Sequence, residues 1–158
     1  MSKFVPSSDV EAVLRWYKGM SSQNATMAME GFTKDCRYWA VGLTDHGLER
    51  YWMSGRDTIT EYLSQNCTRT DPGKLSYVPI HVASAGGTVL VECTTDAMFS
   101  VGYHYQNRGV YVFDCNEEHY IVEMRPFYDW GPVEAHRRAT GWTGAPTSNW
   151  VPASKSTY

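Results

Sequence analysis

Apolar residues recur at helical spacing in the first part of the chain. Within residues 10–17, apolar side chains fall at positions i, i+3, i+4 and i+7, which places them on one face of a helix. Ser8 and Glu11 form the S-x-x-E pattern of a capping box, which satisfies free backbone N–H groups at a helix start. Asn24 can cap a short second helix, and Asp57 can cap a third helix directly after it. The pattern therefore predicts three N-terminal helices.

The pattern changes to that of strands, in which β-branched and aromatic residues dominate, after about residue 75. Gly86-Gly87 is a hairpin signal, and Asn116-Glu117-Glu118 is a turn between two later strands. Helices followed by an antiparallel meander predict an α+β fold, with the three helices packed on one face of a curved antiparallel sheet. We expect strands over 35–41, 77–83, 88–99, 103–113 and 119–128.

The last part of the chain is rich in Gly, Pro and Ser. With 158 residues, the chain is long enough for one domain but not for two separate cores. We therefore expect one domain over 1–132 and a partly disordered tail over 133–158, in which Trp142 and Trp150 are docking points.

Charge and composition exclude several classes of partner. Lys and Arg number 14 and Asp and Glu 17, so the net charge is −3, and no basic run is richer than Arg137-Arg138. A nucleic-acid partner is therefore not expected. No apolar stretch approaches the roughly 20 residues that span a bilayer, so no membrane partner is expected. The start of the chain lacks the apolar segment of a secretion signal, which predicts a cytoplasmic protein with four reduced cysteines.

The sequence carries no recognisable cofactor motif. It has no phosphate-binding loop, no dinucleotide fingerprint, no CxxC pair and no histidine spacing of a metal site. We expect neither a metal nor another cofactor.

Several short segments, taken in order, resemble a known family. They are VLRWY at 13–17, FTKDCRYW at 32–39, SGRDTI at 54–59, GYHYQN at 102–107 and IVEMRPFYD at 121–129. Their order and spacing resemble the SnoaL-like branch of the nuclear transport factor 2-like superfamily, over about residues 8–132. The resemblance implies a cone, in which a bent sheet closed by helices surrounds a mostly apolar pocket. It also implies a homodimer formed through the convex face of the sheet.

The catalytic residues known in this superfamily match the chain unequally. The two acids of ketosteroid isomerase fall near Ala40 and Gly109, which cannot move protons. The last-strand acid of limonene epoxide hydrolase and of the phenazine-biosynthesis protein falls near Pro126. The polyketide-cyclase segment I-V-E-x-W-x-x-x-D keeps its terminal acid as Asp129, although Arg125 replaces the tryptophan. The resemblance therefore favours a cyclase.

Five residues are candidates for catalysis. Asp129, in an apolar pocket, would have a raised pKa and act as general acid/base; its structural alternative is a strand-end cap or an ion pair. Tyr105 and Asn107 share a strand face, where they could bind a carbonyl or enolate oxygen or instead form dimer contacts. Tyr17 could donate to the substrate or belong to the core. His46, in a loop, could shuttle protons or simply be solvated.

Five further residues are expected to bind the substrate. Trp39 and Trp52 flank the loop that carries the candidate histidine. Met124 and Tyr128 share a strand face and are expected to line the pocket together with Phe32.

The expected function is proton-transfer chemistry on a hydrophobic, oxygenated small molecule such as a polyketide or terpenoid intermediate of secondary metabolism. The enzyme would be a cofactor-independent isomerase, dehydratase or cyclase. One alternative is a non-catalytic module that binds a small molecule in the same cone. Another is a water-activating epoxide hydrolase, which requires Glu92 or Asp96 to point inward beside an arginine.

Overall fold

The computed structural model describes residues 4–144 and the backbone of residues 151–152. The helices are α1 (Asp9–Ser21), α2 (Ala25–Ala28), the 3-10 helix η1 (Met29–Gly31), α3 (Arg56–Arg69) and α4 (Trp130–Thr140). The strands are β1 (Phe32–Thr44), β2 (Gly47–Ser54), β3 (Thr70–Ala85), β4 (Thr88–Phe99), β5 (Tyr103–Cys115), β6 (Ile121–Tyr128) and β7 (Val151–Pro152). No helix among these residues is long and apolar enough to cross a membrane.

The first two helices begin at the predicted caps. The Ser8 hydroxyl accepts the backbone N–H of Glu11 at 3.2 Å, and the Asn24 side chain accepts that of Met27 at 2.9 Å. The Glu11 carboxylate accepts from the backbone N–H of Ser7 rather than that of Ser8, so only half of the capping box forms as expected.

Helix α3 begins earlier than predicted. Its N-cap is Gly55, whose φ of 93° suits a residue without a Cβ, and no side chain caps the helix. Asp57 lies instead in the first turn, where a negative charge interacts favourably with the helix dipole.

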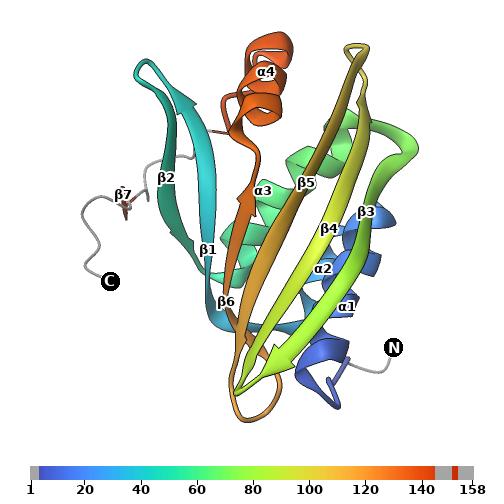
Figure 1. Cartoon of the computed structure of the whole chain (residues 1–158), viewed down its shortest axis with the longest axis vertical. Coiled ribbons are helices and arrows are strands. Elements are labelled where there is room, and N and C mark those ends of the chain that lie inside the picture. Colours follow the sequence, from blue (N-terminus) through green and yellow to red (C-terminus); the bar gives the residue numbers. More distant parts are fainter. Residues whose placement is uncertain (1–3, 145–150, 153–158) are drawn as a thin grey trace.

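The strands form one bent sheet in the order β3-β4-β5-β6-β1-β2-β7 (Figure 1). The predicted meander from β3 to β6 is present, and β1 and β2 form a second antiparallel hairpin. These two units meet along β1 and β6, which run parallel with Phe32 beside Ile121 and Tyr38 beside Met124. The expected curved antiparallel sheet is present apart from this one parallel pairing, which hairpin signals do not reveal because they specify only the pairing of strands that follow one another in the chain.

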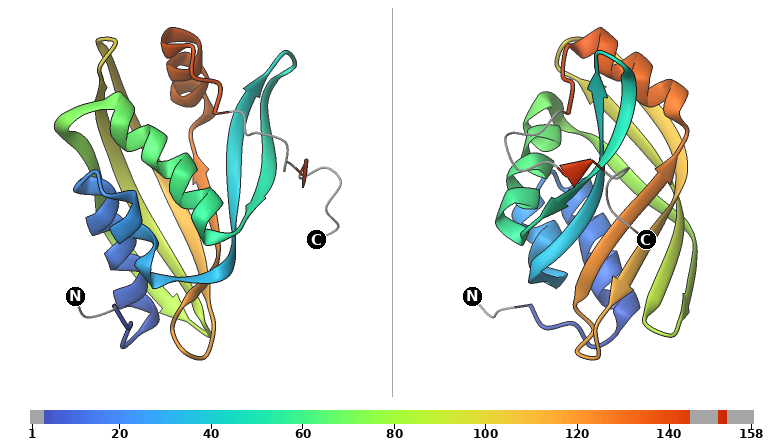
Figure 2. Two further views of the ribbon diagram at one scale, coloured as in Figure 1. Left: turned by 180° about the vertical axis from the view of Figure 1, so that it is seen from behind. Right: turned by 90° about the vertical axis from the view of Figure 1, so that its left-hand side faces the viewer.

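Helices α1 and α3 lie on the concave face of the sheet, as predicted (Figure 2). The core between them and the sheet is built from large side chains that are almost fully buried, such as Trp16 of α1, Leu63 of α3 and Phe113 of β5. Burial of each such side chain contributes about 1.5–3 kcal/mol, so the core favours the bent sheet and its helices together.

The predicted C-terminal tail contains a helix. The Asp129 side chain accepts the backbone N–H of Gly131 at 3.0 Å, and the chain leaves α4 at Gly141, whose φ is 66°. The helix lies between the β1–β2 hairpin and the β4–β5 hairpin (Figure 1), and Trp142 after it is buried. The expected tail over 133–158 is partly disordered, and the structure shows that its residues 133–140 are helical. The docking residue Trp150 lies outside the described residues.

A substitution at Gly19 tests the packing of α1 against α2. A Cβ at this position would overlap the backbone nitrogen and Cα of Ala28. We expect Gly19→Ala to lower the free energy of unfolding by about 2–3 kcal/mol, measured by urea denaturation.

Gly131→Ala is the matched control. Its Cβ would meet only the Asp129 carboxylate, at 3.6 Å, and the helical backbone suits alanine. We expect its free energy of unfolding to be unchanged or raised by roughly 0.5–1 kcal/mol. Equal stability of Gly19→Ala and wild type would contradict the described helix packing.

Candidate active site

A cavity of about 60 Å³ lies at the end of the cone that α4 covers. Its lining comes from β1, α3, β3, β4, β5, β6 and α4, and no Asp or Glu is among the lining residues. Tyrosines dominate it: Tyr38, Tyr62, Tyr77, Tyr105, Tyr111 and Tyr128. A cavity of this size holds a few water molecules.

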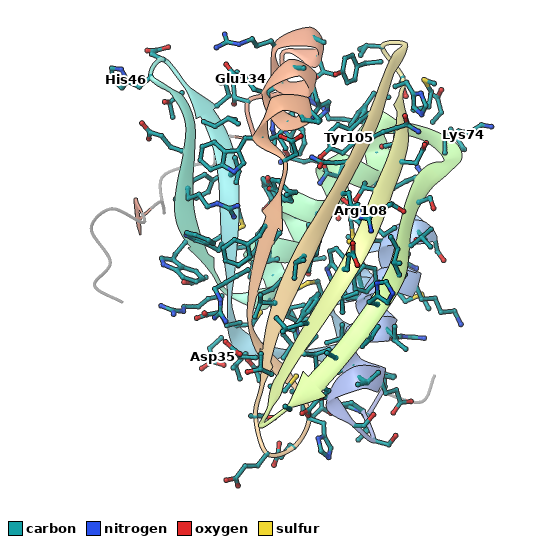
Figure 3. All side chains as sticks on the ribbon, in the orientation of Figure 1. Asp35, His46, Lys74, Tyr105, Arg108 and Glu134 are labelled. Carbon is teal, nitrogen blue, oxygen red and sulfur yellow. The ribbon has the colours of Figure 1, made fainter. Side chains whose placement is uncertain are left out.

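Helix α4 directs two polar side chains to this cavity. Val133, His136 and Arg137 fall at i, i+3 and i+4 and are buried, whereas Glu134 and Arg138 form an ion pair on the exposed side. Figure 3 shows Glu134 on the outside of the helix. The helix therefore presents an imidazole and a guanidinium to the interior.

The guanidinium of Arg137 is held by neutral groups. Arg137 is only 5% exposed. Its Nη2 atom donates to the Val41 carbonyl at 3.2 Å and to the Tyr62 hydroxyl at 3.3 Å. The Trp142 ring centre lies 3.9 Å from the guanidinium carbon, in cation–π contact. The Nε atom is buried and has no hydrogen-bond partner among the described residues.

The imidazole of His136 is packed among aromatic rings. Its ring centre lies 4.1 Å from that of Phe99 and 5.3 Å from that of Tyr105. Burial, followed by the nearby charges of Arg137 and Arg69, lowers the pKa of His136 to about 4, so the imidazole is neutral at pH 7. Its Nε2 atom is buried and has no hydrogen-bond partner among the described residues.

The cavity phenols keep their protons at neutral pH. Burial raises the pKa of Tyr128 to about 12 and raises the pKa values of Tyr38, Tyr77, Tyr105 and Tyr111 further. Protonated phenols are hydrogen-bond donors, so the cavity is suited to hold oxygen atoms that carry partial or full negative charge.

Tyr105 and Asn107 lie side by side, as their shared strand face predicts. The Asn107 amide donates to the Tyr105 hydroxyl oxygen at 2.8 Å and to the Asp129 carbonyl at 2.9 Å. Tyr105 lines the cavity and Asn107 does not (Figure 3 labels Tyr105). Because the Tyr105 oxygen accepts this bond, its proton remains available to another acceptor.

Asp129 is not the desolvated carboxyl that the sequence suggests. It is exposed, and its carboxylate caps α4 by accepting from Gly131. The structure shows the alternative that the sequence left open, in which Asp129 is a cap at the end of the strand.

Other candidates lie away from the cavity. Tyr17 is buried against Trp16 and Phe113 in the core and does not line the cavity. His46 is exposed at the tip of the β1–β2 hairpin (Figure 3), because the segment is a tight turn rather than a loop over the pocket.

Two of the five expected substrate-binding residues face the other side of the sheet. The rings of Trp39 and Trp52 are stacked at 6.0 Å, and Trp39 also contacts Phe127 at 5.3 Å on the outer face. The prediction that they shape the pocket is wrong, because Tyr38 points inward and successive side chains of a strand alternate.

The remaining three substrate-binding candidates point inward, but only one of them lines the cavity. Phe32 and Met124 are each 1% exposed and belong to the core rather than to the cavity lining. Tyr128 lines the cavity, as predicted.

The carboxylates that an epoxide hydrolase would need face outward. Asp96 lies 3.1 Å from His104, and Glu92 lies 2.7 Å from His81 and binds Arg108, all on the outer face of the sheet. Figure 3 shows Arg108 on that face. The condition for water activation by Glu92 or Asp96 is not met. Among the described residues, no three His, Cys, Asp or Glu side chains lie close enough together to hold a metal ion.

Sequence reasoning missed His136 and Arg137 because it assigned them to a tail. The signals of a helix were present: Asp129 as N-cap, Pro132 in the first turn and Gly141 at the end. The helical spacing of Val133, His136 and Arg137 would then have placed the last two on one buried face.

Comparison with known proteins identifies the fold. No protein-family model matches the sequence, and no curated protein matches it. The epoxide hydrolase/cyclase-like enzyme SalBIII, described for pyran ring formation in polyether salinomycin, superposes with a TM-score of 0.63 at 19% identity, over 78% of this chain and 92% of that chain. TerC, co-crystallised with polyporic acid, gives 0.62 at 20% identity, over 84% and 98%.

A third similar structure carries the name of the superfamily. It is an NTF2-like protein from Anabaena variabilis, with a TM-score of 0.63 at 19% identity, over 81% of this chain and 96% of that chain. Identities of this size establish the architecture and not the chemistry. The chain has the α+β cone fold of the nuclear transport factor 2-like proteins, as its resemblance to the SnoaL-like branch predicts.

Proposed function

We propose that the protein is a cofactor-independent enzyme that moves a proton on a small oxygenated organic molecule, as an isomerase, dehydratase or cyclase. The cavity under α4 is its active site, and His136 takes the role first expected of Asp129. One observation carries this proposal: a neutral, buried imidazole lines a cavity of phenol donors and has a nitrogen without a hydrogen-bond partner among the described residues.

The chemistry divides between two kinds of group. His136, neutral at pH 7, accepts a proton from a carbon next to a carbonyl group, and the electron pair of the broken C–H bond moves onto the carbonyl oxygen. Tyr105 donates a hydrogen bond to that oxygen, because its own oxygen already accepts from Asn107. Return of the proton to another atom completes an isomerisation, and loss of a leaving oxygen completes a dehydration.

The low pKa of His136 is compatible with this role. It reflects burial, followed by the nearby positive charges of Arg137 and Arg69. Negative charge that develops on a substrate oxygen stabilises the imidazolium and raises the pKa of His136 during the reaction. The similar fold of a structure described as an epoxide hydrolase/cyclase-like enzyme, and of one crystallised with polyporic acid, supports a small oxygenated substrate.

A binding module remains the second candidate function. No carboxylate lines the cavity, so the usual acid/base group of small-molecule enzymes is replaced by a single imidazole. Retention of an unchanged ligand in native mass spectrometry would favour this candidate, and formation of a product excludes it.

The dimer implied by the resemblance is also proposed. Val78, Leu90, Val110 and Phe127 are between 41% and 51% exposed on the outer face, and Val110 pairs directly with Phe127 across β5 and β6. Exposed apolar side chains gathered on one face are typical of an interaction surface. We propose that two copies of the chain associate through this face.

Substitution of His136 tests its proposed catalytic role. We expect His136→Gln to lower turnover at least about 100-fold, because the amide cannot accept the proton. The assay follows product formation and solvent-deuterium incorporation by mass spectrometry over a panel of cyclic ketones, enols and polyketide-like compounds. Asp129→Asn is the control and keeps full turnover, because the exposed cap does not face the cavity. Full turnover by His136→Gln would refute the role of His136.

Stability at acidic pH tests the burial of His136. Its pKa is about 4 in the folded protein and about 6.5 in the unfolded chain, so the unfolded chain binds the proton more readily between these values. The contribution of the neutral imidazole is therefore complete above about pH 6.5 and is lost as the pH falls toward 4. We expect the loss of unfolding free energy between pH 7 and pH 5 to be about 1–2 kcal/mol larger for wild type than for His136→Phe, measured by urea denaturation. Equal losses would contradict the buried, neutral state.

A charged substitution on the outer face of the sheet tests the proposed dimer. We expect Phe127→Asp to convert the dimer into a monomer, as judged by light scattering after size-exclusion chromatography, because a carboxylate would be desolvated between the two sheets. Val101→Asp is the control, since Val101 is 68% exposed in the β4–β5 turn and lies outside this face. A monomeric wild type, or a dimer that survives Phe127→Asp, contradicts the proposed interface.

A further inference from the structure

Arg137 is a buried cation that has no carboxylate partner among the described residues. All 17 Asp and Glu residues of the chain lie within the described range 4–144, and none of them forms an ion pair with Arg137. The neighbouring Arg138 behaves conventionally, because it is exposed and binds Glu134. The two adjacent arginines of α4 thus differ: the exposed one has a carboxylate partner, and the one that faces the cavity has none among the described residues.

Neutral contacts compensate Arg137 only in part. Its hydrogen bonds to the Val41 carbonyl, the Tyr62 hydroxyl and the Trp142 carbonyl measure 3.2, 3.3 and 3.5 Å, which is long for bonds from a charged donor. Its Nε–H has no partner among the described residues. Removing an arginine from water without a counterion is unfavourable to folding, so the fold alone gives no reason for this charge.

The cavity next to Arg137 has the properties of an anion site. Arg137 lines it, together with the phenol donors of Tyr38, Tyr62 and Tyr128, and no carboxylate repels an anion there. The volume of about 60 Å³ accommodates the head group of a small carboxylate without any movement of α4. A guanidinium presents parallel N–H donors that match the two oxygens of a carboxylate.

We propose that this cavity binds an organic anion, and that the substrate or ligand carries a carboxylate or an acidic enol whose oxygens lie on the Nε side of Arg137, assisted by Tyr62. This inference rests on the proposed function, because it assigns a chemical class to the molecule in the same cavity.

Occupation by an anion also affects His136. The positive charge of Arg137 is one cause of the low pKa of His136, after burial. An anion that pairs with Arg137 reduces this repulsion, so the imidazole accepts a proton more readily with ligand bound than without it. Binding of the acidic group thereby prepares the neighbouring base, and proton uptake accompanies binding below neutral pH.

The experiment uses acetate as the anionic probe and acetamide as its neutral counterpart of similar shape. The readouts are the Nε–H signal of Arg137 and the ring signals of His136 in nitrogen-15 NMR spectra of the full chain, with sodium chloride at matched ionic strength. We expect acetate to shift both sets of signals saturably and acetamide to shift neither. Equal responses to acetate and acetamide, or no response to acetate, would overturn the proposal.

Two variants locate the site. We expect Arg137→Met to weaken acetate binding at least 10-fold, whereas Arg138→Met, which removes the same charge from the exposed side of α4, leaves it within 2-fold of wild type. We also expect Arg137→Met to have an unchanged or higher urea midpoint, because a buried uncompensated charge is removed. Unchanged acetate binding by Arg137→Met would overturn the proposal. If this variant does not fold, the Arg137 Nε–H signal of wild type still decides the question.

The outcome separates this inference from the proposed enzyme. Acetate binding at Arg137 without turnover of any compound in the substrate panel supports the anion site and overturns the enzyme in favour of the binding module. Turnover of neutral compounds together with an Arg137 signal that ignores acetate overturns the anion site and leaves the enzyme in place.

Discussion

The insertion of a charged helix face into the end of a bent sheet determines the interior of this protein. Helix α4 covers the gap between the two hairpins and places His136 and Arg137 where a purely structural helix would place apolar side chains. Burial is the main cause of the lowered pKa of His136, and the positive charge of the buried Arg137 lowers this pKa further. The phenols around them supply donors but no negative charge. The chemistry of the cavity therefore follows from one element that the rest of the cone does not need for its own closure.

The resemblance places the two acids of ketosteroid isomerase near Ala40 and Gly109. Gly109 lies so close to the backbone of Phe127 and Tyr128 that a side chain would clash there. The acid retained at the end of the last strand, Asp129, starts α4 instead of facing the cavity. Asp129 thus carries a structural task, and the imidazole and guanidinium of the interior come from the helix that this residue caps.

Much of the fold could be predicted from the sequence because its signals are local. The capping serine before α1, the glycine pair between β3 and β4 and the alternation along the later strands each act within a few residues. The pairing of β1 with β6 could not be predicted in this way, since the partners lie some 85 residues apart and neither strand marks the other. Part of the site could be predicted, since Tyr105 and Tyr128 line the cavity. Whether Tyr38 or Trp39 faces inward depends on the register of β1, which the sequence pattern does not specify. Residue composition hid α4, because glycine and proline at a helix start resemble the composition of a tail.

The parallel pairing of β1 with β6 also orders events during protein synthesis. The β1–β2 hairpin is made early, yet the strand that joins it to the meander is completed only at Tyr128. Until then, the edge of β1 has no partner along one side and remains exposed to other chains that leave the ribosome. The two hairpin units can therefore join only after β6 has left the ribosome.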